Sequence, residues 1–281
     1  MRNSNIFAVG TLCSVLGLGL SGTAQAGITP VDPALCELMK ANNVISEQNP
    51  IGCDRLRVVS FAFTNFQGDT EQGAVTVLDA FAPSVQTLFD ALHGQAFPLA
   101  KAQGLERYQG DDGASMADNN TSAFNERPIT GGSRRSLHAY GAAIDLNPLQ
   151  NPYIGIEPNG EAMIDPLAAA HTYVNRLQYR PDKPERFGLA EPVVDIFADN
   201  GFINWGGYFN FPIDYQHFEV GPRSFIEHLA RVSPEHAATD FDGYVAFYRS
   251  CLLESAEQDP AARRADCVSN TLENYQFPSG T

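Results

Sequence analysis

Long hydrophobic runs are almost missing from this sequence of 281 residues. The clearest one, residues 6–20, is shorter than the roughly 20 apolar residues that cross a bilayer as a helix. Arg2 precedes this run and Ala24-Gln25-Ala26 follows it, which is typical of a secretory leader and its cleavage site. We therefore expect residues 1–26 to be a signal peptide. The product is expected to be exported to the periplasm or the exterior, without stable membrane insertion.

Positive charge is also scarce. Eighteen Lys and Arg face 33 Asp and Glu, and the formal net charge is −15. Because phosphate backbones are bound mainly through Lys and Arg, nucleic acid is not an expected partner. The glycine-rich spots lack the spacing of nucleotide-binding loops, and neither G-x-S-x-G nor S-x-x-K occurs. These absences argue against nucleotide binding and against a serine nucleophile.

The chain contains no C-x-x-C pair, so neither a thiolate zinc site nor a redox motif is expected. Four cysteines follow the predicted cleavage site: Cys36, Cys53, Cys251 and Cys267. An even number in an exported protein predicts disulfides. Three pairings are possible, and the nearest-neighbour one, Cys36–Cys53 with Cys251–Cys267, is the simplest. Each bond of that pairing would close a loop of about 15 residues, worth on the order of 3 kcal/mol in the chain-entropy model.

Hydrophobic spacing predicts a mixture of strands and helices. A Val- and Phe-rich run over 56–63 predicts a strand, and 74–78 predicts its hairpin partner. Apolar residues at helical spacing predict a helix from Pro83 to Leu92. Residues 109–135 are polar and aperiodic, which is typical of a long functional loop. Further strands are expected over 97–100, 142–146, 202–205 and 217–220, and further helices over 34–41, 191–200 and from 224 onward.

Two short segments contain candidate metal ligands. His138 and Asp145 are separated by Gly141, which permits the chain to turn back between them. Asp145 ends an apolar stretch, where burying a carboxylate is costly unless the charge is paired. A bound metal ion would supply that partner. Farther along, His217 follows Asp214 by three residues. Two histidines and one aspartate leave the fourth position of tetrahedral zinc to water, so we predict one zinc ion on His138, Asp145 and His217.

These segments match two motifs of a known group of zinc peptidases. The motif S-x-H-x-x-G-x-A-x-D is matched by Ser136, His138, Gly141, Ala143 and Asp145. The motif W-G-G … D-x-x-H-F-E is matched by Trp205, Gly206, Gly207, Asp214, His217, Phe218 and Glu219. The sequence thus resembles the VanY-type D-alanyl-D-alanine carboxypeptidases and the related phage L-alanyl-D-glutamate endopeptidases. The similarity covers about residues 55–222 and departs at Glu126, where many relatives carry Cys.

The resemblance implies a role for each site residue. Asp214 would be the general base beside the three zinc ligands. Arg127 would either hold a carboxylate of the substrate or polarise the scissile carbonyl. Ser136 would hydrogen-bond near the metal or stabilise its own loop. Tyr215, next to Asp214, would belong to the protein core or line the substrate cleft.

The resemblance also implies a fold and a domain organisation. We expect an α+β domain of the hedgehog/D,D-peptidase type, with a small, mostly antiparallel sheet flanked by helices and the zinc in an open cleft. This domain would cover residues 55–222. An N-terminal extension over 27–54 would precede it, and a helical extension over 223–281 would follow it. We expect a monomer.

The implied activity is hydrolysis of the stem peptides of peptidoglycan, with D-alanyl-D-alanine carboxypeptidase as the leading expectation. One alternative is a wall-lytic endopeptidase of the L-alanyl-D-glutamate type. Another is a catalytically silent zinc protein that binds cell-wall peptides. Asp214 and Arg127 argue against the catalytically silent alternative, because a protein that only binds peptides needs no general base beside its metal.

Overall fold

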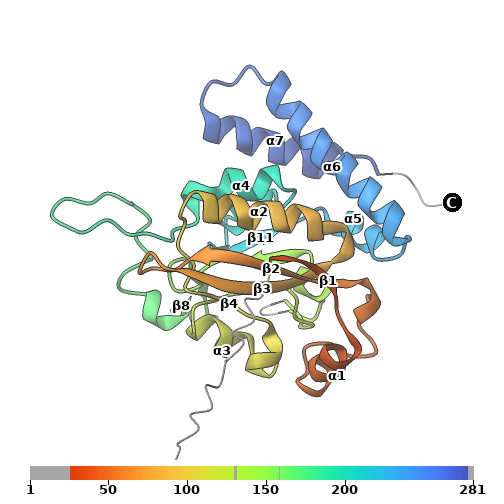
Figure 1. Cartoon of the computed structure of the whole chain (residues 1–281). Coiled ribbons are helices and arrows are strands. Elements are labelled where there is room, and N and C mark those ends of the chain that lie inside the picture. Colours follow the sequence, from red (N-terminus) through yellow and green to blue (C-terminus); the bar gives the residue numbers. More distant parts are fainter. Residues whose placement is uncertain (1–25, 130–131, 158, 278–281) are drawn as a thin grey trace, which may run out of the picture.

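The computed structural model describes residues 26–129, 132–157 and 159–277 (Figure 1). Apart from Ala26, the predicted signal peptide lies outside these ranges. Within them the chain has the predicted α+β class, with seven α-helices and several small, mostly antiparallel sheets. None of the helices in the described part combines the length and the apolar character needed to cross a bilayer.

The longest strands form a three-stranded sheet, and helix α2 packs on one face of it (Figure 1). Its strands, in spatial order, are β1 (Gly27–Pro30), β2 (Leu56–Thr64) and β3 (Thr70–Leu78). The pair β2–β3 is the predicted hairpin, and its antiparallel pairing is continuous from Leu56↔Leu78 to Thr64↔Thr70. The predicted apolar side of α2 (Ala82–Gly94) is buried, and Phe89 stacks on Phe61 with ring centroids 3.7 Å apart. This stacking ties the helix to the sheet.

The other strands are only two to four residues long. They are β4 (Lys101–Ala102), β5 (Asn120–Thr121), β6 (Ala143–Asp145), β7 (Tyr153–Ile156), β8 (Ala162–Asp165), β9 (Asn204–Trp205), β10 (Ile213–Asp214) and β11 (His217–Glu219). They pair as β6–β11–β9, β10–β7–β8 and a parallel β4–β5. The other helices are α1 (Pro33–Ala41), α3 (Asp112–Ala117), α4 (Val194–Asp199), α5 (Arg223–Leu229), α6 (Pro234–Glu254) and α7 (Pro260–Asn274).

Both ends of the described chain are fastened by disulfides. Cys36 of α1 is bonded to Cys53, and Cys251 of α6 is bonded to Cys267 of α7, which confirms the nearest-neighbour pairing. The α6–α7 hairpin lies beyond α2 and α4 (Figure 1). Phe241 of α6 is buried and meets Phe81 at 4.7 Å, edge to face. The two terminal segments therefore pack on the same core as the rest of the chain.

Two expectations about local structure are wrong. Residues 97–100 are not a strand: a single bridge joins Pro98 to Thr64, and a proline cannot donate to a ladder. The segment 109–135 is not a continuous loop, because it contains α3 and β5. The side chain of Asp111 caps α3 by accepting from the N–H of Ala114 at 3.0 Å, a start signal that outweighs the weak periodicity.

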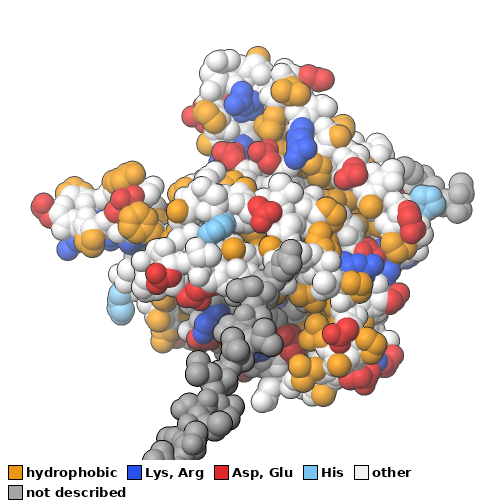
Figure 2. Space-filling model, viewed as in Figure 1, with side chains coloured by type: hydrophobic (Ala, Val, Ile, Leu, Met, Phe, Trp, Pro, Cys, Tyr) orange, Lys and Arg blue, Asp and Glu red, His pale blue; other side chains and the backbone are white. Residues whose placement is uncertain are grey.

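A long irregular segment between β8 and α4 projects from the body of the molecule (Figure 1). Figure 2 shows hydrophobic side chains on this projection. Leu177 and Tyr179 are 67% and 75% exposed there. The buried guanidinium of Arg186 donates to the carbonyl oxygens of Asn175 and Leu177, at 2.6 and 2.7 Å. The projection is therefore held by hydrogen bonds to its own backbone.

Candidate metal centre

Strand pairing brings the three predicted ligands together. In the antiparallel pair β6–β11, His217 lies directly opposite Asp145. His138 stands on a short 3-10 turn just before β6, and Gly141 then reverses the chain with φ +62°. A Cβ atom on Gly141 would lie 2.5 Å from the backbone nitrogen of Leu78, so no larger residue fits this turn. Sheet register and turn geometry together place His138 against the strand pair.

The three side chains offer their ligand atoms at one point. The His138 Nε2 atom lies 3.2 Å from His217 Nδ1 and 3.2 Å from Asp145 Oδ2, and His217 Nδ1 lies 3.0 Å from Asp145 Oδ1. Zinc bonds of about 2.0–2.1 Å at tetrahedral angles place neighbouring ligand atoms roughly 3.3 Å apart. The observed separations are close to this value.

In each histidine, one ring nitrogen points away from the predicted metal position and is hydrogen-bonded. The other nitrogen is then the one that can bind a metal ion. The carbonyl oxygen of Ala123 accepts from His138 Nδ1, so the lone pair of His138 is on Nε2. The carboxylate of Glu219 accepts from His217 Nε2 at 2.9 Å, so the lone pair of His217 is on Nδ1. When both rings are neutral, their lone pairs point to one place, with 3.2 Å between the two nitrogens. A cation between the rings would accept both lone pairs, and backbone carbonyls or carboxylates behind metal-binding histidines are the usual support of such a site.

The third predicted ligand, Asp145, is an ionised carboxylate. Asp145 is only 3% exposed, and burial by itself would favour its neutral form. The charges and hydrogen bonds of His138 and His217 outweigh this effect and hold the pKa of Asp145 well below its usual range. Two imidazole nitrogens and one carboxylate oxygen, all within 4.8 Å of one another, fit a zinc ion.

A cavity of about 310 Å³ opens beside the metal centre. Its polar lining consists of Arg127, Ser136, Asp214, His217, Glu219 and Arg223. Its apolar lining consists of Ile129, Leu137, Tyr153, Phe209 and Pro212. His217 belongs to both the cavity wall and the metal centre. A molecule in the cavity would therefore lie next to a metal ion bound by His217.

Asp214 lies in this cavity wall but outside the cluster of metal ligands. It ends β10, and its Oδ1 atom is buried without a hydrogen-bond partner among the described residues. Burial and the negative charge of Asp145 raise the pKa of Asp214 to about 6. A Cβ on Gly206 would come within 2.1 Å of the Asp214 carbonyl oxygen, so a glycine at 206 is required for this close approach. A carboxylate with a free oxygen and a raised pKa suits a general base.

Of the remaining predicted site residues, two line the cavity and one does not. Arg127 lines the cavity and forms an ion pair with Asp112 at 2.9 Å. Ser136 also lines the cavity, and its Oγ accepts from the His138 N–H at 3.3 Å. The lining does not include Tyr215, whose ring lies 4.3 Å from the guanidinium of Arg176. Ser136 thus lies beside His138 in the cavity wall, whereas Tyr215 packs behind the site.

Two further functional candidates are Glu219, which the sequence analysis placed in a motif without assigning it a role, and Arg223, which it did not name. Glu219 orients His217, and it also accepts from Asn204 Nδ2 at 2.7 Å. The spacing of Glu219 gave a signal for this contact, because residues two apart on a strand face the same side. Arg223 lies in the cavity wall at the start of α5, and no motif singled it out.

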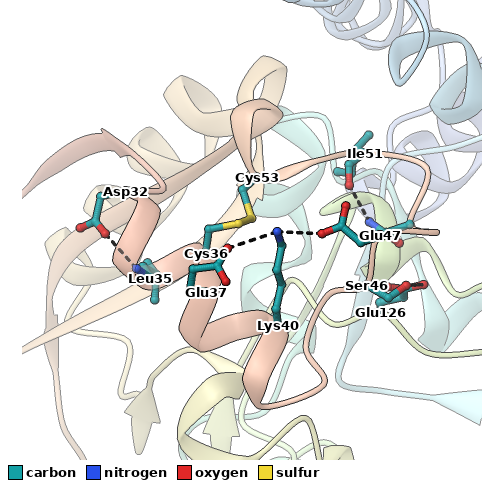
Figure 3. Close-up of a disulfide and its surroundings, with 11 residues drawn as sticks. Asp32, Leu35, Cys36, Glu37, Lys40, Ser46, Glu47, Ile51, Cys53 and Glu126 are labelled. Atoms are coloured by element: carbon teal, nitrogen blue, oxygen red, sulfur yellow. Dashed lines mark hydrogen bonds and ion pairs between the residues drawn. A yellow bond between two sulfur atoms is a disulfide. The ribbon is translucent and has the colours of Figure 1, made fainter.

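The N-terminal segment supports the residue before Arg127 (Figure 3). The Glu126 carboxylate accepts from the Ser46 N–H at 2.5 Å, from Ser46 Oγ at 3.0 Å and from Arg135 Nη2 at 3.0 Å. The backbone N–H of Glu126 donates to the Val44 carbonyl at 2.9 Å. The Glu126 carboxylate links the disulfide-closed segment to the segment that carries Arg127.

Replacing Glu126 by alanine is therefore expected to lower kcat/KM by roughly 10-fold. The substitution removes the hydrogen bonds to the Glu126 carboxylate, which hold the backbone that carries Arg127. Zinc content should stay unchanged, since none of the ligands is touched. Glu47→Ala is the matched control, because Glu47 is next to Ser46, the partner of Glu126. Glu47 is 75% exposed, and its surface ion pair with Lys40 contributes little to stability. Equal activities of the two variants would show that Glu126 does not position Arg127.

Comparison with known proteins agrees with this geometry. Residues 130–220 match a family model described as D-alanyl-D-alanine carboxypeptidase. The matched segment contains His138, Asp145, Asp214 and His217, and it confirms the resemblance to the VanY-like family. Arg127 and all the cysteines lie outside it. Searches of curated proteins and of solved structures returned no match.

Proposed function

We propose that this chain is a zinc-dependent carboxypeptidase acting on peptidoglycan stem peptides. Its residues 130–220 match the D-alanyl-D-alanine carboxypeptidase family model. The family match supports a peptidase of peptidoglycan in general. The observation that supports the finer proposal is the juxtaposition in one cavity of a metal centre and a buried, unpartnered carboxylate oxygen on Asp214. A protein that only binds peptides has no use for such a base.

Each side chain of the site has a separate role in the proposed peptide hydrolysis. When bound, zinc supplies an acidified water and a Lewis acid that polarises a carbonyl. Asp214 takes a proton from the attacking water and delivers it to the leaving amine. Arg127 binds negative charge on the substrate, at a carboxylate or at the scissile carbonyl. Ser136 and Glu219 keep His138 and His217 in place through hydrogen bonds to the backbone and to the ring.

We also propose export of the protein. Two disulfides support this proposal, because such bonds persist in oxidising compartments. The proposed substrate lies in the same compartment. One chain contributes all the residues of the site, which supports action as a monomer.

The nature of the products tests the proposed reaction. Purified zinc-loaded protein should remove a single terminal D-alanine from a muropeptide with a pentapeptide stem, and mass spectrometry should detect the shortened stem. Treatment with a chelator should stop the reaction. Cleavage between L-alanine and D-glutamate would instead show the wall-lytic endopeptidase, and an uncut stem would show that the protein is no peptidase of this substrate.

A further inference from the structure

A second guanidinium group, that of Arg223, faces the cavity beside the metal centre. Arg223 is the first residue of α5 and follows the end of β11 by four residues. It lines the same cavity as Asp214 and His217 and is partly buried. The helix behind it is fixed, because Phe225 and Ile226 are fully buried in the core. The side chain is therefore presented to the cavity from a rigid element.

The two arginines of the cavity differ in their partners. Arg127 is neutralised by Asp112, with 2.9 Å between Nη2 and Oδ2. Within the described ranges, Arg223 has no carboxylate at ion-pair distance and its side chain donates no hydrogen bond. Glu219, the glutamate of the same cavity wall, already accepts hydrogen bonds from His217 and Asn204. The five N–H donors of Arg223 are consequently available to a ligand.

A planar guanidinium fork matches a carboxylate, which it binds through two parallel hydrogen bonds. The cavity wall beside it also contains Phe209 and Pro212, which offer an apolar surface to a small side chain. In the proposed reaction the terminal carboxylate is only one residue beyond the scissile bond, so it remains in the same cavity as the metal. An endopeptidase substrate has a peptide group at that place instead.

We propose that Arg223 binds the free α-carboxylate at the C-terminal end of the substrate and so selects for carboxypeptidase cleavage. This inference rests on the proposed function and extends it, because it names the group that recognises the end of the chain. With the carboxylate bound by Arg223, Arg127 is left to stabilise the scissile carbonyl.

The test compares one peptide in two forms. An N-acetylated peptide ending in D-Ala-D-Ala is supplied as the free acid and as the C-terminal amide, to wild type and to Arg223→Met. We expect the variant to lose roughly 10- to 100-fold in kcat/KM for the free acid, as is typical of a lost charge-assisted contact, with little change for the amide. Arg231→Met is the matched control, since Arg231 is exposed on the turn that follows the same helix. Zinc content should be equal in all three proteins.

A binding measurement separates this inference from the proposed function. Calorimetry on zinc-loaded Asp214→Asn protein, with and without Arg223→Met, measures the affinity for both peptides without depending on turnover. Weaker binding of the free acid alone supports the inference even if wild type cleaves neither peptide, an outcome that would overturn the proposed function. Equal preference for acid over amide in wild type and Arg223→Met would overturn the role of Arg223 and leave the peptidase proposal standing.

Discussion

Replacing His217 by alanine should remove both the bound zinc and the hydrolytic activity. His217 supplies one of three ligand atoms, and its loss leaves two donors that cannot hold the ion against water. Removing only an outer partner of a ligand costs about 10- to 100-fold in metal affinity. We therefore expect His217→Ala to lose more than roughly 100-fold, as measured by zinc titration against a competing chelator.

Two further variants provide a graded control for this loss. Glu219→Gln weakens the support of His217 without removing a ligand, and it should show the smaller, roughly 10- to 100-fold loss of affinity. His171→Ala should behave like wild type, because His171 is exposed. Zinc affinity unchanged in His217→Ala would contradict the ligand assignment.

Asp214→Asn is expected to lower kcat by about 10²–10⁴-fold, the usual contribution of a general acid–base group. The substitution keeps the size and shape of the side chain but removes its ability to take a proton. KM should change little, because the loss concerns proton transfer and not ground-state binding. Zinc content and fold should also be preserved, since Asp214 lies outside the ligand cluster. Steady-state kinetics on the D-Ala-D-Ala peptide, together with zinc analysis, measures all of these quantities.

The exposed Asp90 of α2 provides the matched control as Asp90→Asn, which should retain wild-type activity. Near-normal turnover in Asp214→Asn would exclude Asp214 as the base. Loss of zinc in the same variant would mean instead that Asp214 is a ligand and that the metal centre differs from the one described above.

Local signals in the sequence were enough to predict the parts of the fold that depend on near neighbours. The β2–β3 hairpin and α2 follow from alternating and helical spacing of apolar residues, and both are present. The pairing of β7 with β8 and β10 could not be predicted in the same way. These strands are only two to four residues long, and β10 is distant from β7 in the chain.

The candidate site could be predicted to a similar extent. His138, Asp145 and His217 belong to motifs with fixed spacing, so residue type and order were informative. The proximity of Arg223 to Asp214 depends on how α5 packs after β11, and no spacing rule encodes that packing. The placement of Tyr215 behind the site depends on its contact with Arg176, which is 39 positions away (215 − 176) and on another segment.

Anomalous scattering at the zinc edge, from crystals of the zinc-loaded protein, tests the metal centre most directly. We expect one strong peak in contact with three atoms: His138 Nε2, His217 Nδ1 and a carboxylate oxygen of Asp145. An oxygen-containing ligand should complete the tetrahedron on the cavity side, where Asp214 can reach it. A peak at any other set of side chains, or no peak in zinc-loaded crystals, would contradict the account.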